Sequence, residues 1–109
     1  MEKKEISILF TNLLNTIDLI LNSEFYTDKC DLIEVKVKIE EWYRNYKNSS
    51  SLKSINYKDL EFMDSDIMEL FDEYIKTESV SNNYVERLSY DFNILLKKWK
   101  EEMIGGKIV

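Results

Sequence analysis

Residues 59–78 read DLEFMDSDIMELFDEYIKTE, and this stretch carries the pattern on which the fold depends. Its apolar side chains recur at steps of three and four residues: Leu60, Met63, Ile67, Leu70 and Tyr74. Because an α-helix completes a turn in 3.6 residues, side chains at this spacing share one face. The stretch is therefore predicted to form an amphipathic helix that buries this face.

The other side of the same stretch is strongly acidic. It contains eight carboxylates and one base, Lys76, so its net charge is −7, whereas the whole chain carries −6. The carboxylates are Asp59, Glu61, Asp64, Asp66, Glu69, Asp72, Glu73 and Glu78. A concentrated field of one sign attracts partners of the opposite sign, so a basic partner is expected.

Three further segments show the same helical spacing. Residues 3–22 have the most apolar stripe, formed by Ile6, Phe10, Leu13, Ile17 and Ile20. In residues 28–47 the stripe is Leu32, Val35, Ile39, Trp42 and Tyr46. In residues 83–104 it is Val85, Leu88, Phe92, Leu95, Trp99 and Met103. Asn83 and Glu86 are a candidate cap pair, and residues 48–54 are the main expected linker.

Residues 32–40 permit a second interpretation. Ile33, Val35, Val37 and Ile39 alternate with charged residues, which is the pattern of a half-buried β-strand. A single strand would have no partner for its backbone groups, and the helical stripe continues through Trp42. A helix is therefore favoured, with an α+β fold as the alternative.

Composition agrees with a helical protein. The chain has no proline, and its two glycines are Gly105 and Gly106, where the last helix is expected to end. A length of 109 residues suits one domain with a real core. The expected fold is all-α: a single-domain antiparallel four-helix bundle over residues 1–109, with a flexible tail at 105–109.

Cysteine content and hydrophobicity bear on the compartment. Cys30 is the single cysteine and cannot form an internal disulfide, as is usual for proteins of the reducing cytoplasm. Residues 6–21 are apolar, but polar residues interrupt them and the run is too short to span a membrane. A cytoplasmic protein is therefore expected.

Catalytic and cofactor motifs are not found. The chain has no histidine, which removes the commonest general base and zinc ligand. Asp64 and Asp66 begin like an EF-hand loop, but Glu69 occupies the glycine position and Ile75 the position of the final glutamate. Neither an enzyme nor a metal or cofactor site is expected.

The segment around Ser65 also resembles the phosphopantetheine-attachment region of acyl carrier proteins. Asp64-Ser65 precedes an acidic helix, as in that family, where the serine bears the prosthetic arm. The resemblance covers about a dozen residues and implies a small helical carrier. It departs from the family pattern at Asp66, where the family has leucine, and in the sequence after Ile75.

Some apolar residues lie off the predicted core stripes. Phe62 falls among Asp59, Glu61, Asp66 and Glu69, where it could anchor a basic partner. A helix that starts after Asn56 would place it there, whereas a start at Asp64 or Ser65 would let it pack on the linker. Tyr90 and Ile94 lie opposite the last stripe, where they could contact a second copy or widen the core.

These patterns lead to two functional hypotheses. The first is a small protein-binding inhibitor, similar in size and charge to immunity proteins, antitoxins and phage-encoded anti-nuclease or anti-CRISPR proteins. It would cover a basic, nucleic-acid-binding surface of its partner with no direct contact to nucleic acid. The expected contact residues are Tyr57, Asp59, Glu61, Phe62, Asp66, Glu69, Asp72 and Glu73. The alternative is a non-enzymatic structural or regulatory bundle that acts as a homodimer through Tyr90 and Ile94.

Overall fold

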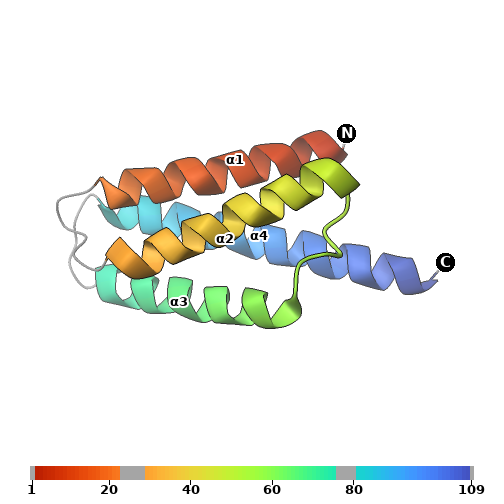
Figure 1. The fold of residues 1–109 in the computed structure, drawn as a ribbon. Helices are drawn as coiled ribbons and strands as arrows, with labels where there is room; N and C mark the ends of the chain where they lie inside the picture. Colours follow the sequence, from red (N-terminus) through yellow and green to blue (C-terminus); the bar gives the residue numbers. More distant parts are fainter. Residues whose placement is uncertain (1, 23–28, 76–80, 109) are drawn as a thin grey trace.

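The protein is a bundle of helices. A computed structural model describes residues 2–22, 29–75 and 81–108, and four helices account for most of these residues (Figure 1). They are α1 (Glu2–Leu21), α2 (Lys29–Ser49), α3 (Tyr57–Ile75) and α4 (Ser81–Ile108). The predicted all-α four-helix bundle is confirmed.

Successive helices run in opposite directions, as Figure 1 shows. The closest packing joins α1 to α4, α3 to α4 and α1 to α2. Helices α2 and α3 approach each other less closely, so a seam runs between them.

Ion pairs bridge the helix pairs at the surface: Lys36 with Asp18 at 2.7 Å, Lys38 with Asp59 at 3.5 Å and Lys98 with Glu5 at 4.0 Å. Such exposed pairs contribute little stability, so apolar packing holds the bundle together.

The core follows the predicted stripes. Phe10 of α1 and Phe92 of α4 are fully buried, together with leucines and isoleucines from all four helices. The Phe10 ring stacks on Tyr43 of α2 with 5.3 Å between centroids. Each fully buried apolar side chain stabilises the fold by about 1.5–3 kcal/mol relative to an exposed one.

No helix in the described ranges combines the length and hydrophobicity that a membrane span requires.

The strand alternative for residues 32–40 is wrong, because α2 is helical from Lys29 to Ser49. A strand would place Ile33, Val35, Val37 and Ile39 on one face. Instead, Val35 and Ile39 are buried, whereas Ile33 and Val37 are about half exposed. The helical stripe prevails because it also buries Trp42 and Tyr46 in the same core.

The expected boundaries of the last helix are also wrong. Helix α4 begins at Ser81, so Asn83 lies within the helix rather than at its cap. It continues through Gly105 and Gly106 to Ile108. A glycine in a helix costs about 1 kcal/mol relative to alanine, and no proline follows to force an end. With 28 residues, α4 is about 42 Å long, and its C-terminal part projects beyond the other helices (Figure 1).

The segment between α2 and α3 is an ordered part of the structure. Ser50 has a φ of 56°, and its N–H donates to the Tyr46 carbonyl at 2.7 Å, which ends α2. The Leu52 and Ile55 side chains are buried. The Glu102 carboxylate of α4 accepts hydrogen bonds from the Ser51 hydroxyl at 2.5 Å and from the Leu52 N–H at 3.0 Å. These contacts fix the 50–56 linker to α4.

A substitution at Glu102 should show how much this attachment stabilises the fold. Glu102→Ala removes the acceptor of the Ser51 and Leu52 hydrogen bonds, so the free energy of unfolding is expected to fall by about 1.5–3 kcal/mol. Urea denaturation measures the loss. The control is Glu101→Ala at the exposed neighbouring position, with an expected change within about 0.5 kcal/mol. Equal effects of both substitutions would contradict the role of Glu102.

Asp91 of α4 is a carboxylate in the core, with 9% of its surface exposed. Burial raises its pKa, and the attraction of Arg87 opposes this only in part. A carboxyl group whose pKa is higher in the folded than in the unfolded state stabilises the fold most at pH values below the pKa of the unfolded state. That contribution is lost as pH rises through the folded pKa.

Asp91→Asn is therefore expected to stabilise the fold at neutral pH, because asparagine has a similar shape and no charge to bury. The difference from the wild type should be larger at about pH 7 than at about pH 3, where the carboxyl is protonated in both states. Urea denaturation at the two pH values measures it. If the variant is less stable than the wild type at pH 7, the attraction between Asp91 and Arg87 outweighs the cost of burying the Asp91 charge.

Candidate functional site

The candidate site is built on α3, whose start is fixed by its sequence. The Asn56 side-chain oxygen accepts a hydrogen bond from the Lys58 N–H at 2.8 Å, which caps the helix. The predicted start after Asn56 is thereby confirmed. From there the helix buries Leu60, Met63 and Ile67 against the bundle and turns its acidic side outward.

Most of the predicted contact residues lie on this outward side. Glu61, Phe62, Asp66, Glu69 and Asp72 are exposed. Asp59 is partly buried and pairs with Lys38 across the seam. Glu73 belongs to α3, but its side chain is outside the described part of the structure.

Phe62 is the most prominent apolar group on this surface. Its side chain is 72% exposed, the highest value among the large apolar residues that the structure describes. The alternative that Phe62 packs on the linker is wrong, because α3 already begins at Tyr57. On one side of Phe62 is a groove toward α4, and on the other is a smaller hollow toward α2.

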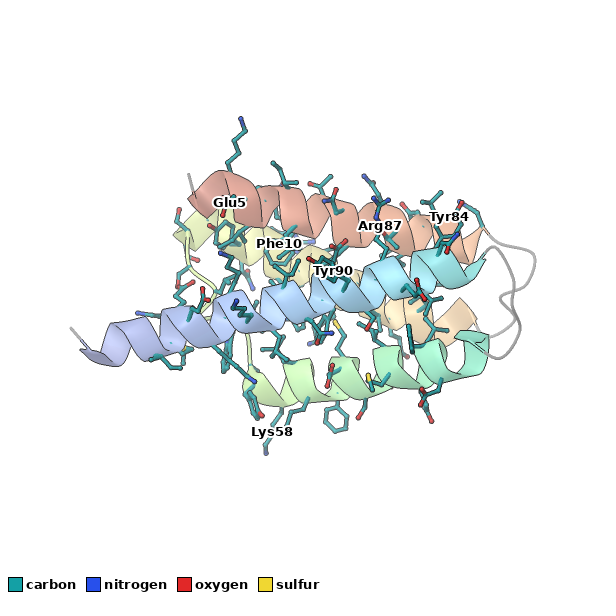
Figure 2. The ribbon with its side chains drawn as sticks, turned by 180° about the vertical axis from the view of Figure 1, so that it is seen from behind. Glu5, Phe10, Lys58, Tyr84, Arg87 and Tyr90 are labelled. Carbon is teal, nitrogen blue, oxygen red and sulfur yellow. The ribbon has the colours of Figure 1, made fainter. Side chains whose placement is uncertain are left out.

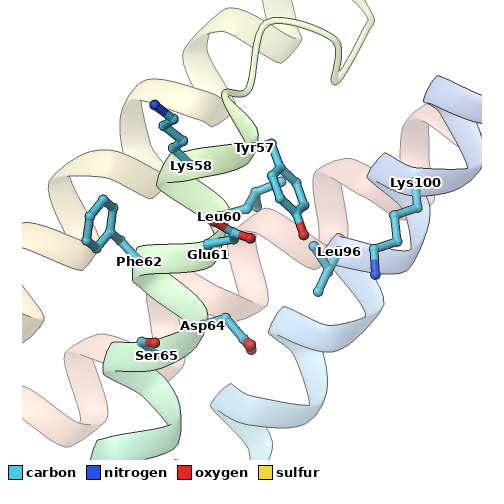
Figure 3. A pocket seen from close by; sticks show the side chains of 9 residues that line it. All are labelled: Tyr57, Lys58, Leu60, Glu61, Phe62, Asp64, Ser65, Leu96 and Lys100. Carbon is cyan, nitrogen blue, oxygen red and sulfur yellow. The ribbon is translucent and has the colours of Figure 1, made fainter.

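The groove between α3 and α4 has a volume of about 780 Å³. Tyr57, Glu61 and Asp64 of α3 face Leu96 and Lys100 of α4 across it, as Figure 3 shows. The remaining lining residues are Lys58, Leu60, Phe62 and Ser65. In Figure 3 the side chains of Lys58, Phe62 and Ser65 point away from α4. Two carboxylates and two ammonium groups line this groove, so its charges balance.

Tyr57, which is about half exposed, supports the site from the groove between α3 and α4. Its ring stacks on Trp99 of α4 with 5.6 Å between centroids. Its hydroxyl donates a hydrogen bond to Glu61, and this bond, with the negative charges of Glu61 and Asp64, raises the Tyr57 pKa. The Trp99 indole N–H in turn donates to the Ile55 carbonyl at 3.2 Å. Tyr57 therefore holds α3 on α4, although it was predicted only as a partner contact.

The residues suggested for a dimer contact differ from each other. Tyr90 is 68% exposed on α4 (Figure 2), whereas Ile94 is partly buried and packs against the core. Ile94 thus belongs partly to a wider core, and Tyr90 is the more accessible of the two.

Glu34 and Lys38 of α2 also lie at the site, although the sequence pattern alone does not single them out. Both line the hollow beside Phe62, together with Val35, Asp59, Met63 and Asp66. Charged residues alternate with apolar ones along residues 33–40, and this pattern does not indicate which of the charged side chains lie beside α3. Their proximity to α3 depends on how the helices pack.

The described residues were compared with metal-binding arrangements, and the chain with known proteins. Within the described residues, no group of three or more carboxylate or thiol side chains is arranged to hold a metal ion. Searches for related proteins returned no matching family model, no matching curated protein and no matching solved structure.

Proposed function

We propose that this protein is a protein-binding inhibitor that covers a basic, nucleic-acid-binding surface of its partner with the outward side of α3. The observation that carries the proposal is the exposed Phe62 ring within a field of carboxylates. Immunity proteins, antitoxins and phage-encoded anti-nuclease or anti-CRISPR proteins act in this general way.

Charge density along α3 supports this choice of partner. The helix has 19 residues and a length of about 28 Å, and seven of its residues are carboxylates. That is about one carboxylate per 4 Å of helix axis. A DNA strand carries one charge per about 3.4 Å. A protein surface shaped to bind a phosphate backbone would meet a similar density of negative charge on α3.

Phe62 would supply apolar contact area, which the carboxylates of α3 cannot provide. Exposed ion pairs contribute little affinity because water and salt screen them. Interface energy is concentrated in a few aromatic residues that become buried, with polar groups around them. Phe62 would be such an anchor, with Glu61, Asp66 and Glu69 as its polar rim.

The site is also held in place before binding. The Asn56 cap, the Tyr57–Trp99 stack and the Glu102 contacts fix the first turns of α3 relative to α4. A preorganised helix loses little conformational entropy when it docks. Such a surface suits inhibition by simple occlusion, with no chemical step.

Affinity capture with the intact protein tests the proposal. The bait is incubated with lysate of its own host and with the products of neighbouring genes, then washed at rising salt. The expected result is one basic protein that elutes as salt rises and whose nucleic-acid binding is blocked by the pure inhibitor. Capture of a partner that still binds nucleic acid would contradict occlusion.

The homodimer is the second candidate, and the exposed Tyr90 is the observation that favours it. Light scattering of the purified protein measures its mass. A dimer that captures no basic protein and separates upon Tyr90→Ser substitution would support this candidate. A monomer would exclude it.

A further inference from the structure

Helix α4 has a second face with coiled-coil spacing, on the side opposite its buried stripe. The residues of this outer face follow one another at steps of four and three: Tyr90, Ile94, Lys97, Glu101 and Ile104. The first four are each two residues after a member of the buried stripe: Leu88, Phe92, Leu95 and Trp99. Because an α-helix turns by about 100° per residue, the two faces lie about 200° apart around the helix axis.

The outer face is open to solvent. Tyr90 is 68% exposed (Figure 2) and Ile104 is 57% exposed, whereas Ile94 is partly buried. Lys97 and Glu101 are exposed, and neither forms an ion pair within the residues that the structure describes. A helix with apolar residues at this spacing on both of its faces can pack against another helix on each side.

We propose that the outer face of α4 binds the outer face of a second copy of this protein, as two antiparallel helices related by a two-fold axis at the level of Trp99. Lys97 then lies opposite Glu101 of the second copy, and Ile94 lies opposite Ile104 of the second copy. The inference rests on the homodimer candidate, which it deepens by naming how two copies meet. The groove side of α4, toward α3, stays uncovered, so the inhibitor proposal is a separate question.

The order of charges on the outer face selects a second copy in this orientation. Lys97 is two residues before Trp99 and Glu101 is two residues after it, so a two-fold axis at that level exchanges their positions. Ile94 and Ile104 are five residues before and after the same level. Each dimer would contain two Lys97–Glu101 ion pairs between two pairs of isoleucines. Parallel helices in register would instead place like charges opposite each other, which repel.

The C-terminal end of α4 gives the second copy something to stabilise. This end projects beyond the other three helices (Figure 1) and contains Gly105 and Gly106, which are poor helix formers. Helices in proteins owe most of their stability to the packing of an apolar face. In the antiparallel pair, Ile104 near the projecting end would pack on Ile94 of the second copy. A second copy would thus supply packing for the part of α4 that lies beyond its own bundle.

Sedimentation equilibrium of the intact protein over a range of concentrations tests the pairing. The contact is one helix wide and has charges at its centre, so we expect a weak dimer with a dissociation constant in the micromolar range. Lys97→Glu places like charges opposite each other, and so does Glu101→Lys. Each substitution alone is expected to raise the dissociation constant at least about tenfold.

Mixing the two single variants is the decisive measurement. In the mixture, both glutamates of one chain face both lysines of the other, so a heterodimer about as tight as the wild-type dimer is expected. Mixing changes nothing within either helix, so a variant that had lost its structure would stay monomeric. The controls Arg44→Glu and Glu41→Lys make the same changes in net charge at exposed positions of α2 and should alter the dissociation constant less than about threefold.

Two results would overturn the inference in different ways. A wild type that stays monomeric at every concentration would exclude both this pairing and the homodimer candidate, and affinity capture would still decide the inhibitor proposal. A wild-type dimer whose two charge variants fail to associate on mixing would leave the homodimer candidate standing and show that the antiparallel α4 register is wrong.

Discussion

Replacing Trp99 with alanine is expected to lower the free energy of unfolding by about 3–5 kcal/mol, because a large buried ring leaves a cavity. The variant also leaves the Ile55 carbonyl without its indole donor. A protein of this length has a total stability of about 5–15 kcal/mol, so much of it would be lost. Urea denaturation followed by circular dichroism measures the change.

A milder substitution separates the hydrogen bond from the packing. Trp99→Phe keeps most of the ring but removes the N–H that bonds Ile55, with an expected loss of about 1–2 kcal/mol. Trp42→Phe is the matched control, since Trp42 is also buried and no hydrogen bond of its indole is recorded within the described part of the chain. Trp99→Phe should therefore cost more than Trp42→Phe. Equal costs would show that the bond to Ile55 adds nothing.

Replacing Phe62 with alanine is expected to weaken partner binding by about 30-fold, the effect of losing roughly 2 kcal/mol at an interface hot spot. The same change should leave unfolding almost unaffected, because the side chain is 72% exposed. Met68→Ala is the control, as Met68 is an exposed apolar residue on the same helix. It should change affinity less than about threefold if binding energy is concentrated at Phe62.

Charge reversal tests the electrostatic part of the same surface. Asp66→Lys with Glu69→Lys should slow association at low salt, and the effect should shrink as salt screens the charges. Glu40→Lys with Glu41→Lys makes the same change in net charge at exposed positions of α2 and should have a smaller effect. Combined with Phe62→Ala, the α3 reversal is expected to abolish inhibition without unfolding the bundle. Normal affinity in this triple variant would rule out α3 as the contact surface.

Much of this fold was predictable from sequence because burial follows a helical period. The stripe residues Trp42, Leu70 and Trp99, for example, are all buried in the core. Exposure of Phe62 followed from the interpretation in which α3 starts after Asn56, whereas a start at Asp64 or Ser65 predicted that Phe62 packs on the linker. These predictions depend on residues within about two turns of each other.

The features that were not predictable from sequence depend mostly on contacts between residues that are distant in the chain. The linker was predicted only as a connection, yet Ser51 and Leu52 bond Glu102 about 50 residues later. Glu34 joins Phe62 at one hollow only because α2 and α3 are neighbours across the seam. The end of α4 was predicted incorrectly because the glycine rule for helix ends is a preference of about 1 kcal/mol.

The packing of α1 against α4 has a consequence for synthesis on the ribosome. Helix α1 emerges before the other three helices and has the most apolar stripe, but part of its partner surface lies on α4, which emerges after α2 and α3. Helix α2 can cover one flank of α1 early, whereas the side of α1 that faces α4 stays uncovered until α4 has been synthesised. During that interval the nascent protein exposes side chains that the finished bundle buries, which is the period in which chaperones bind and aggregation competes.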